Sequence, residues 1–351
     1  MLGGEPHLQG AAHLFGESRS YNPRTMRKVL RSLFSSPAKP AAPALVPLAV
    51  SGDAISPRVV MLVHNPIIER EGGRRLNQVL GWNDPDALAD RYVDDVAEVS
   101  HGRVRYQIVE RIVVDGFPRK ADGFRYTDDS FLRAWRARNG FHQPDTADYA
   151  ALLREADFLR KVEQNLADEL WLFAFPYGGY YESCMGGPGA VWCNGPVLPN
   201  TAHLPRRFVV MGFNYERGVG EMLEDLGHRA ESILEHVFEG AAPADHLWHQ
   251  FIQHDKTHPG RAACGNVHFA PNSDTDYDWG NRRKVMSSAD DWLKYPALTG
   301  AARVMTCADW GNGDIREHHR WWMRRFAHAD GVNGRGYANN WWRYVAGLEI
   351  R

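Results

Sequence analysis

Acidic side chains and one imidazole recur at helical spacing in the longest helix that the sequence predicts. Successive members are separated by three, four, three and four positions: Glu221, Glu224, His228, Glu231 and Glu235. Residues three and four apart share one face of a helix, so these five form a single stripe. Like charges at this spacing destabilise a helix by about a few tenths of a kcal/mol per pair. A bound divalent cation would turn that repulsion into coordination.

The same stripe also fits a simpler interpretation, the solvated acidic face of an amphipathic helix. The opposite side of the predicted helix carries apolar residues such as Val219, Leu223 and Leu226, which would face a core. Stripes of charge on such helices are usually exposed to water. The sequence alone leaves both interpretations open.

Glu224 and His228 stand four residues apart, the spacing at which two side chains on one helix can bind the same zinc ion. The segment Glu224-Asp225-Leu226-Gly227-His228 resembles the zinc-binding helix HExGH of the zincin metallopeptidases. Glu replaces the first His of that motif, and Asp replaces its catalytic Glu. The resemblance covers the segment 207–238, including a strand before the helix. It implies Glu224 and His228 as zinc ligands and Asp225 as the group that polarises water.

Further candidates for the metal site come from the same helix and from a downstream loop. His228-Arg-Ala-Glu231 is similar to the HxxE ligand pair of zinc carboxypeptidases, so Glu231 is a candidate ligand. His268 is the best third ligand after the helix, and Glu221 could assist Asp225 in activating water. We therefore expect a zinc site with metal ligands among Glu224, His228, Glu231 and His268.

Alternating aspartates follow His268 and suggest a calcium loop. They are Asp274, Asp276 and Asp278. An EF-hand that starts at Asp274 needs Gly at its sixth position and Glu at its twelfth, where this chain has Trp279 and Val285. The sequence therefore favours an Asp-rich turn over a calcium site.

Tryptophan is concentrated in the second half of the chain, with 9 of 12 after residue 190. Indole faces beside amide and carboxylate groups suit a sugar ring, but they also suit ordinary packing. Five residues are the candidates for substrate binding: Tyr180, Trp192, Trp279, His318 and Trp322. The carbohydrate surface and the packed aromatic core remain alternatives.

Four strands and three helices are expected to position these residues. Apolar runs predict strands at 58–64, 103–114, 169–175 and 207–213. Helical periodicity predicts helices that start at Asp84-Pro85 and at Thr146, and a longer one over 216–238. This alternation is typical of an α/β fold, a layered mixed sheet flanked by helices, with α+β as the variant left open.

Three regions follow from the change in pattern along the chain. Residues 1–56 form a leader or Pro/Ala linker, and residues 57–240 form the α/β core. Residues 241–351 lack clear periodicity, which predicts an irregular, aromatic-rich region packed on that core.

Composition excludes some classes of protein. The chain has 41 Lys and Arg against 43 Asp and Glu, a formal net charge of −2, which argues against a nucleic-acid partner. No apolar run reaches the roughly 20 residues needed to span a bilayer. We expect a small-molecule, peptide or glycan substrate instead.

The cellular compartment is indicated only by the leader and the cysteines. A basic segment at 24–31 precedes an apolar one at 40–50, the order found in secretory signals, which favours export. Four cysteines allow two disulfides in an exported protein and equally allow four thiols in the cytosol.

The sequence thus favours a zinc-dependent, peptidase-like hydrolase. The alternatives are an exported carbohydrate-binding protein and a catalytically inactive relative of a hydrolase, which the altered HExGH segment itself suggests.

Overall fold

The computed structural model describes residues 54–350. Within these residues, the predicted core and the aromatic-rich region form a single unit. The basic and apolar segments of the predicted leader lie outside the described residues. No helix within 54–350 is long and apolar enough to cross a membrane.

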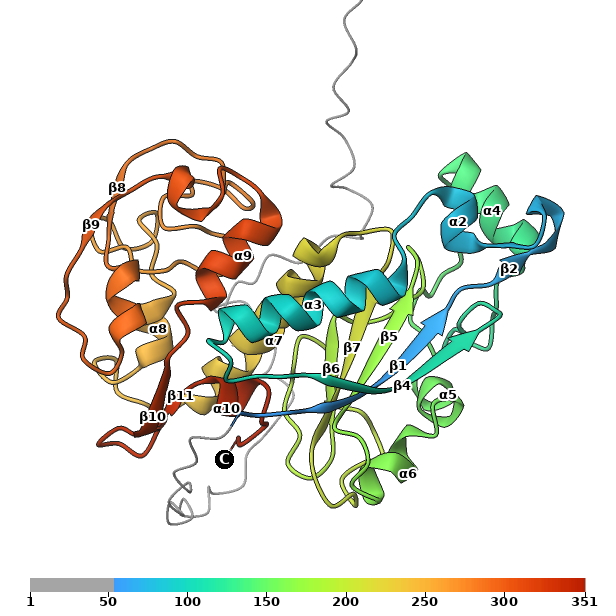
Figure 1. The fold of residues 1–351 in the computed structure, drawn as a ribbon, viewed down its shortest axis with the longest axis horizontal. Helices are drawn as coiled ribbons and strands as arrows, with labels where there is room; N and C mark the ends of the chain where they lie inside the picture. The colour runs from blue at the N-terminus through green and yellow to red at the C-terminus, as the bar shows by residue number, and fades with distance from the viewer. Residues whose placement is uncertain (1–53, 351) are drawn as a thin grey trace, which may run out of the picture. The chain divides into compact units, whose positions relative to one another are not determined.

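A five-stranded sheet forms the centre of the fold (Figure 1), with strand order β4-β1-β5-β7-β6. The first four strands in this order run parallel, and β6 joins the edge antiparallel to β7. The strands are β1 (Arg58–His64), β4 (Gln107–Val114), β5 (Glu169–Ala174), β6 (Ser183–Gly186) and β7 (Phe208–Asn214). The predicted α/β class, a mixed sheet flanked by helices, is confirmed.

Both faces of the sheet are covered, which explains why its central strands are mostly apolar. Side chains on a strand alternate between the faces. In β1, Val59 and Met61 belong to one buried cluster, which includes residues of α3 (Pro85–Val99) and α7 (Val219–Val237). Val60 and Leu62 belong to a second cluster with residues of α5 (Tyr149–Glu155) and α6 (Phe158–Glu163).

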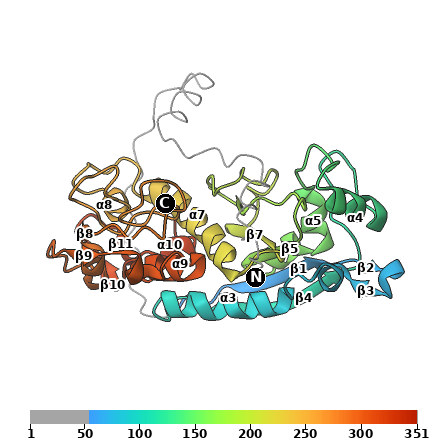
Figure 2. The ribbon, with the colours of Figure 1, turned by 90° about the horizontal axis from the view of Figure 1, so that it is seen from above.

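The other elements of the first half lie around the ends of the strands, and those of the second half pack beside α7 (Figures 1 and 2). The former are β2 (Ile67–Ile68), η1 (Glu69–Glu71), β3 (Arg74–Arg75), α2 (Leu76–Leu80) and α4 (Asp128–Ala137). The latter are α8 (Leu247–Phe251), β8 (Val285–Ser287), η2 (Ala289–Lys294), β9 (Arg303–Met305), η3 (Cys307–Trp310), α9 (Ile315–Met323), β10 (His328–Val332), β11 (Ala338–Asn340) and α10 (Trp342–Val345). Long loops connect them.

The predicted elements differ from the observed ones where local backbone chemistry intervenes. The strand at 58–64 and the helix from Pro85, capped by the Asp84 carboxylate, form as predicted. The single helix expected from Thr146 is two short helices, because Asp157 between them adopts a left-handed backbone with φ of 47°. Strand β6 and helix α4 were not predicted from the sequence.

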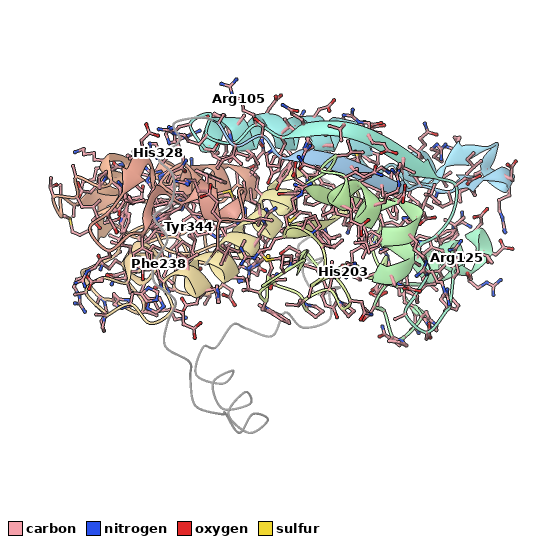
Figure 3. The ribbon with its side chains drawn as sticks, turned by 90° about the horizontal axis from the view of Figure 1, so that it is seen from below. Arg105, Arg125, His203, Phe238, His328 and Tyr344 are labelled. Carbon is pink, nitrogen blue, oxygen red and sulfur yellow. The ribbon has the colours of Figure 1, made fainter. Side chains whose placement is uncertain are left out.

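The tryptophans of the second half form a core instead of a surface. Eight of the nine after residue 190 are buried, and only Trp192 is exposed, with 53% of its surface accessible. Trp341 contacts Trp248, Trp292 and Phe238, which follows the end of α7. In Figure 3, Phe238 and Tyr344 both lie in the part built by the C-terminal segments. The aromatic excess therefore stabilises a region with little regular secondary structure, and the predicted sugar-binding surface loses most of its basis.

All four cysteines are buried free thiols. The two disulfides that the sequence allowed for an exported protein are not formed in this structure. The cysteines therefore give no support to the prediction of export.

A buried ion pair fixes α7 to the sheet, and its loss is expected to destabilise the fold. Arg229 and Glu169, both essentially inaccessible to solvent, are 2.7 Å apart, and Glu169 also accepts a hydrogen bond from Trp171. Arg229→Met is expected to lower the free energy of unfolding by about 3–5 kcal/mol, because it leaves a buried carboxylate without its partner. Urea unfolding measures this.

The control for that experiment is the exposed Arg111, which pairs with Asp86 and Asp90 on the surface. Arg111→Met is expected to change the free energy of unfolding by less than about 1 kcal/mol. Equal effects of the two substitutions would show that the buried pair does not hold α7 in place.

Candidate metal centre

Three side chains from two distant segments converge beside α7. Glu224 and His228 lie one turn apart on this helix, and His268 comes from the loop that follows α8. One ligand atom from each side chain lies within 4.8 Å of the other two. All three are partly buried, with 14%, 17% and 21% of the respective side chains accessible.

The spacing of the three donor atoms matches a zinc site. The Nε2 atoms of His228 and His268 are 3.1 Å apart. Oε1 of Glu224 lies 3.2 Å from the His268 nitrogen and 3.9 Å from the His228 nitrogen. Ligands at zinc bond lengths in a tetrahedron are separated by about 3.4 Å. Two histidines and one glutamate with an open fourth position are a common ligand set of catalytic zinc.

Carboxylates behind the two histidines would orient them for metal binding. Nδ1 of His228 lies 3.2 Å from Glu231, whose other oxygen accepts a hydrogen bond from the Val267 backbone. Nδ1 of His268 lies 3.8 Å from Asp276. Each imidazole thus presents Nε2 to the cluster, and the hydrogen bond between Nδ1 of His228 and Glu231 is the arrangement that fixes the tautomer of metal-bound histidines. Asp276 lies near Nδ1 of His268 but beyond hydrogen-bond distance. Glu231, predicted as a ligand, contacts the back of His228 instead of joining the three donors.

Glu182 is a fourth carboxylate at this centre, from the loop that leads into β6. Its Oε2 lies 4.0 Å from Nε2 of His228 and accepts a hydrogen bond from the side chain of Asn194. Partial burial raises the pKa of Glu182, and the charge of Glu224 adds to this rise. A carboxyl with a raised pKa next to a candidate metal site has the properties of a general acid or base.

The charged side chains of the cluster influence one another's pKa values. Burial opposes the charge on His228, but Glu182, Glu231 and Glu224 outweigh it and raise the pKa of His228 to about 9. Burial also opposes the charge on Glu224, but the hydrogen bond from His268 and the neighbouring histidines lower the pKa of Glu224. The carboxylates therefore favour a positive charge at this point.

Two aromatic residues complete the surroundings. The Tyr277 hydroxyl lies 3.1 Å from Nε2 of His268, and burial raises the pKa of Tyr277, so the phenol keeps its proton and can donate a hydrogen bond. His319, fully buried on α9, donates from Nε2 to the Val267 carbonyl at 3.2 Å. Burial lowers the pKa of His319 to about 4, so this side chain is neutral and supports the loop that carries His268.

The residues predicted to act on water have other surroundings. Glu221 accepts a hydrogen bond from the backbone of Gly218 and therefore caps the start of α7. Asp225 makes no hydrogen bond or ion pair with any residue in 54–350, and burial raises its pKa, as do Glu182, Glu224 and Glu221. Neither comes within ion-pair distance of a histidine in this part of the chain, whereas Glu182, which was not among the residues predicted from the sequence, lies 4.0 Å from His228.

Most residues predicted to bind substrate are not at the surface. Trp322 and His318 are fully buried, and Trp279 is buried and stacks on His318 with ring centres 4.9 Å apart. The Tyr180 hydroxyl forms a hydrogen bond of 2.8 Å with Nδ1 of His64. These residues have packing and anchoring roles in the structure. Only Trp192 is exposed, two positions before the Asn194 that contacts Glu182.

A second group of possible metal ligands fits an ion less well. Glu235, His246 and His249 also lie within 4.8 Å of one another. However, the two imidazole rings stack in parallel with centres 3.4 Å apart, and Nδ1 of His246 accepts a hydrogen bond from the His249 backbone. A metal-bound histidine normally donates from its other nitrogen, so His246 is an N-cap and not a prepared ligand.

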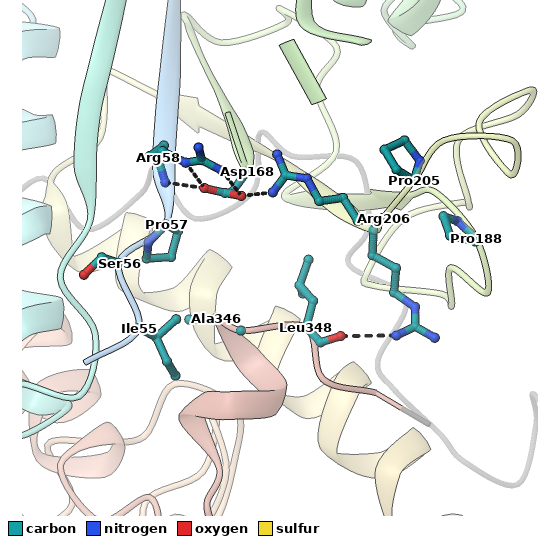
Figure 4. A pocket seen from close by; sticks show the side chains of 12 residues that line it. Ile55, Ser56, Pro57, Arg58, Asp168, Pro188, Pro205, Arg206, Ala346 and Leu348 are labelled. Atoms are coloured by element: carbon teal, nitrogen blue, oxygen red, sulfur yellow. Dashed lines mark hydrogen bonds and ion pairs between the residues drawn. The ribbon is translucent and has the colours of Figure 1, made fainter. Parts of the chain in front are cut away.

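A cavity of about 770 Å³ lies away from the cluster, at the amino ends of β1, β5 and β7 (Figure 4). Asp168 is ion-paired there with both Arg58 and Arg206, and the carbonyl of Leu348 accepts from Arg207. No residue of the metal cluster lines this cavity. None of the residues predicted to bind a metal, to act on water or to bind substrate lines this cavity.

Gly227 allows the loop that carries His268 to approach α7 closely. A Cβ atom at this position would lie 2.7 Å from a methyl group of Val267 and 3.3 Å from Trp322. Gly227→Ala is expected to weaken zinc binding by roughly tenfold or more, because such overpacking costs about 1–3 kcal/mol. Competition with a chromogenic chelator measures the affinity. Helix content is expected to remain, since Ala favours helices, and unchanged zinc affinity would contradict the expectation.

Comparison with family models, curated proteins and solved structures gives no match for this chain.

Proposed function

We propose that the protein is a zinc-dependent hydrolase of the peptidase type, with Glu224, His228 and His268 as zinc ligands. The single observation that carries the proposal is the convergence of these three donors, with separations of 3.1, 3.2 and 3.9 Å, while both imidazoles keep a carboxylate behind Nδ1. The local resemblance of the helix to the zincin motif agrees with it. Glu231 and Asp276 support the ligands in this proposal.

The surrounding residues have distinct roles in the proposed reaction. A zinc ion at this point would supply a Lewis acid and would lower the pKa of a water molecule in the open position. Glu182 accepts the proton of the attacking water and passes it to the leaving group, since its raised pKa suits both steps. The Tyr277 hydroxyl donates a hydrogen bond to the substrate oxygen on which negative charge develops.

The first test is elemental analysis of the purified full chain. We expect about one zinc per chain, and His228→Ala is expected to lose it because two donors cannot retain the ion. His249→Ala, which removes an exposed imidazole of the second Glu and His group, is the matched control and is expected to keep the zinc. A chain without zinc, or zinc retained in His228→Ala, would overturn the proposed ligands.

The second candidate, a carbohydrate-binding protein, has one residue left in its favour, the exposed Trp192. A single exposed indole is a weak basis for a sugar platform, so the hydrolase is the better supported function.

A further inference from the structure

We propose that the cavity at the amino ends of β1, β5 and β7 binds an organic phosphate, that is, a phosphate monoester with an apolar body (Figure 4). None of the candidate metal ligands lines this cavity, so the inference goes beyond the proposed function and does not depend on it. The charge of the cavity, its accessibility and its apolar walls support the inference in turn.

The parallel sheet brings the charged side chains of this cavity together. Arg58 is the first residue of β1, Asp168 precedes β5, and Arg206 and Arg207 precede β7. These three strands are parallel neighbours, so their amino ends meet at one edge of the sheet. Among the described residues that line the cavity, three arginines accompany one carboxylate, which gives a formal excess of two positive charges.

The single carboxylate does not balance the three guanidinium groups. Asp168 lies 2.8 Å from Nε of Arg58 and is also paired with Arg206, so two cations share it. Arg207 donates only to backbone carbonyls and forms no ion pair with any residue in 54–350. This guanidinium therefore carries a charge for which the described residues provide no counterion.

The surroundings of two of these arginines disfavour their charge. Burial lowers the pKa of Arg206 and of Arg207, and the nearby charge of Arg58 lowers the pKa of Arg206 further. Arginine nevertheless keeps its proton in proteins. A bound anion would therefore offset a positive charge that the protein itself leaves unbalanced.

A ligand of moderate size can reach these groups. The side chains of Arg58, Arg206 and Asp168 are 29%, 27% and 24% accessible. The cavity volume of about 770 Å³ lies within the range of about 300–1,000 Å³ found for pockets that bind small molecules. The charged groups are thus open to a molecule larger than a simple ion.

The remaining walls indicate the chemistry of that molecule. They are mostly apolar, with Ile55, Pro57, Pro188, Pro205, Ala346 and Leu348. Proline fixes its backbone φ angle, so three of these positions are held in place before a ligand binds. Apolar walls suit a carbon skeleton, while the planar fork of arginine pairs with two oxygens of a phosphate or carboxylate group.

The excess of positive charge favours phosphate over carboxylate. A phosphate monoester carries about two negative charges above its second pKa of about 6, whereas a carboxylate carries one. Two negative charges match the formal excess on the cavity lining. The geometry and charge together therefore point to an organic phosphate.

Calorimetric titration of the full chain at about pH 8, where the ester is a dianion, tests this inference. Phenyl phosphate, benzoate and benzyl alcohol share a phenyl ring and carry two, one and no negative charges. Phenyl phosphate is expected to bind about tenfold or more tightly than benzoate, and benzyl alcohol is expected not to bind measurably. Inorganic phosphate is expected to bind severalfold more weakly than phenyl phosphate, because it cannot bury apolar surface on the walls.

Two of these results would overturn the inference. Benzoate that binds as tightly as phenyl phosphate would show that the second charge is not recognised. Inorganic phosphate that binds as tightly as phenyl phosphate would show that the apolar walls take no part.

Arg207→Met is the diagnostic variant, because it removes one guanidinium and breaks no ion pair within 54–350. Its affinity for phenyl phosphate is expected to fall by about tenfold or more, since a charged hydrogen-bond partner is lost. Arg207→Lys keeps the charge without the fork and is expected to lose less. The exposed Arg111→Met is the matched control and is expected to bind as the unaltered protein does. Unchanged affinity in Arg207→Met would overturn the inference.

A last control separates this cavity from the candidate metal centre, because phosphate groups also bind metal ions. The titration is repeated with His228→Ala, which lacks one of the proposed zinc ligands. Its affinity for phenyl phosphate is expected to be unchanged, whatever the zinc content of the protein. Loss of binding in His228→Ala, with Arg207→Met unaffected, would place the anion at the metal centre and refute the cavity as its site.

Discussion

Glu182→Gln is expected to lower the rate of peptide hydrolysis by about 10²–10⁴-fold and to leave one zinc per chain in place. The amide keeps the size of the carboxyl group and its hydrogen bond with Asn194, but it cannot take a proton from water. The loss is expected in kcat, because proton transfer occurs in the transition state. Turnover of a mixed peptide pool, followed by mass spectrometry, and elemental analysis of the same preparation measure the two quantities.

Two further variants separate the possible roles of this carboxylate. Glu221→Gln tests the residue that the sequence offered as an assistant to Asp225, and only a small loss of rate is expected, because Glu221 caps the start of α7. Loss of zinc from Glu182→Gln would instead make Glu182 a fourth ligand. Hydrolysis within twofold of the unaltered protein would remove it from the mechanism.

Removal of the metal is expected to lower thermal stability by an amount on the order of 10 °C. An ion that binds only the folded chain adds about 4 kcal/mol when its free concentration is 1,000 times Kd, and each kcal/mol shifts Tm by about 2–4 °C in a large domain. The ion also replaces repulsion among Glu182, Glu224 and Glu231. Calorimetry before and after chelation, followed by addition of zinc, measures the shift.

His268→Ala connects that stability to the site. Without the third donor, the difference in Tm between chelated and zinc-supplemented protein is expected to disappear, whereas the control His249→Ala is expected to retain it. A zinc-dependent shift that survives in His268→Ala would place the ion elsewhere, and the Glu235, His246 and His249 group would become the first alternative.

Much of the core could be predicted from local patterns because those patterns report burial directly. The run at 58–64 is apolar at nearly every position, since helices cover both faces of β1. Strand β6 lacked such a pattern because its four residues, Ser183–Gly186, are too few to show a period. Its antiparallel edge position depends on pairing with β7, a contact distant in sequence.

The candidate site likewise has residues that local spacing predicted and one residue that it did not predict. Glu224 and His228 lie one turn apart on one helix face, so their spacing made them candidate ligands, and the sequence also proposed His268, which the structure brings beside them. Glu182, the proposed general acid and base, was not predicted, because it stands 42 positions before Glu224 in a loop that follows a Gly-rich turn. No residue at a regular spacing from Glu182 indicated a partner for it.

The role of the aromatic residues depended on the tertiary structure. Composition reveals the excess of tryptophan, but it does not tell which tryptophans become buried when the segments pack. The long loops of the second half form few hydrogen-bonded strand pairs. Large flat side chains such as Trp341 and Trp248 fill the space between these loops. Of the nine tryptophans after residue 190, Trp192 alone stays at the surface.

Regular spacing along the chain was enough to predict the apolar strands, the long helix and the stripe of carboxylates that carries one histidine. The packing of distant segments then brings His268 and Glu182 to this stripe and places Glu231 against the back of His228. This difference arises because a helix fixes the direction of its side chains within a few residues, whereas the distances between segments are set only when the core packs.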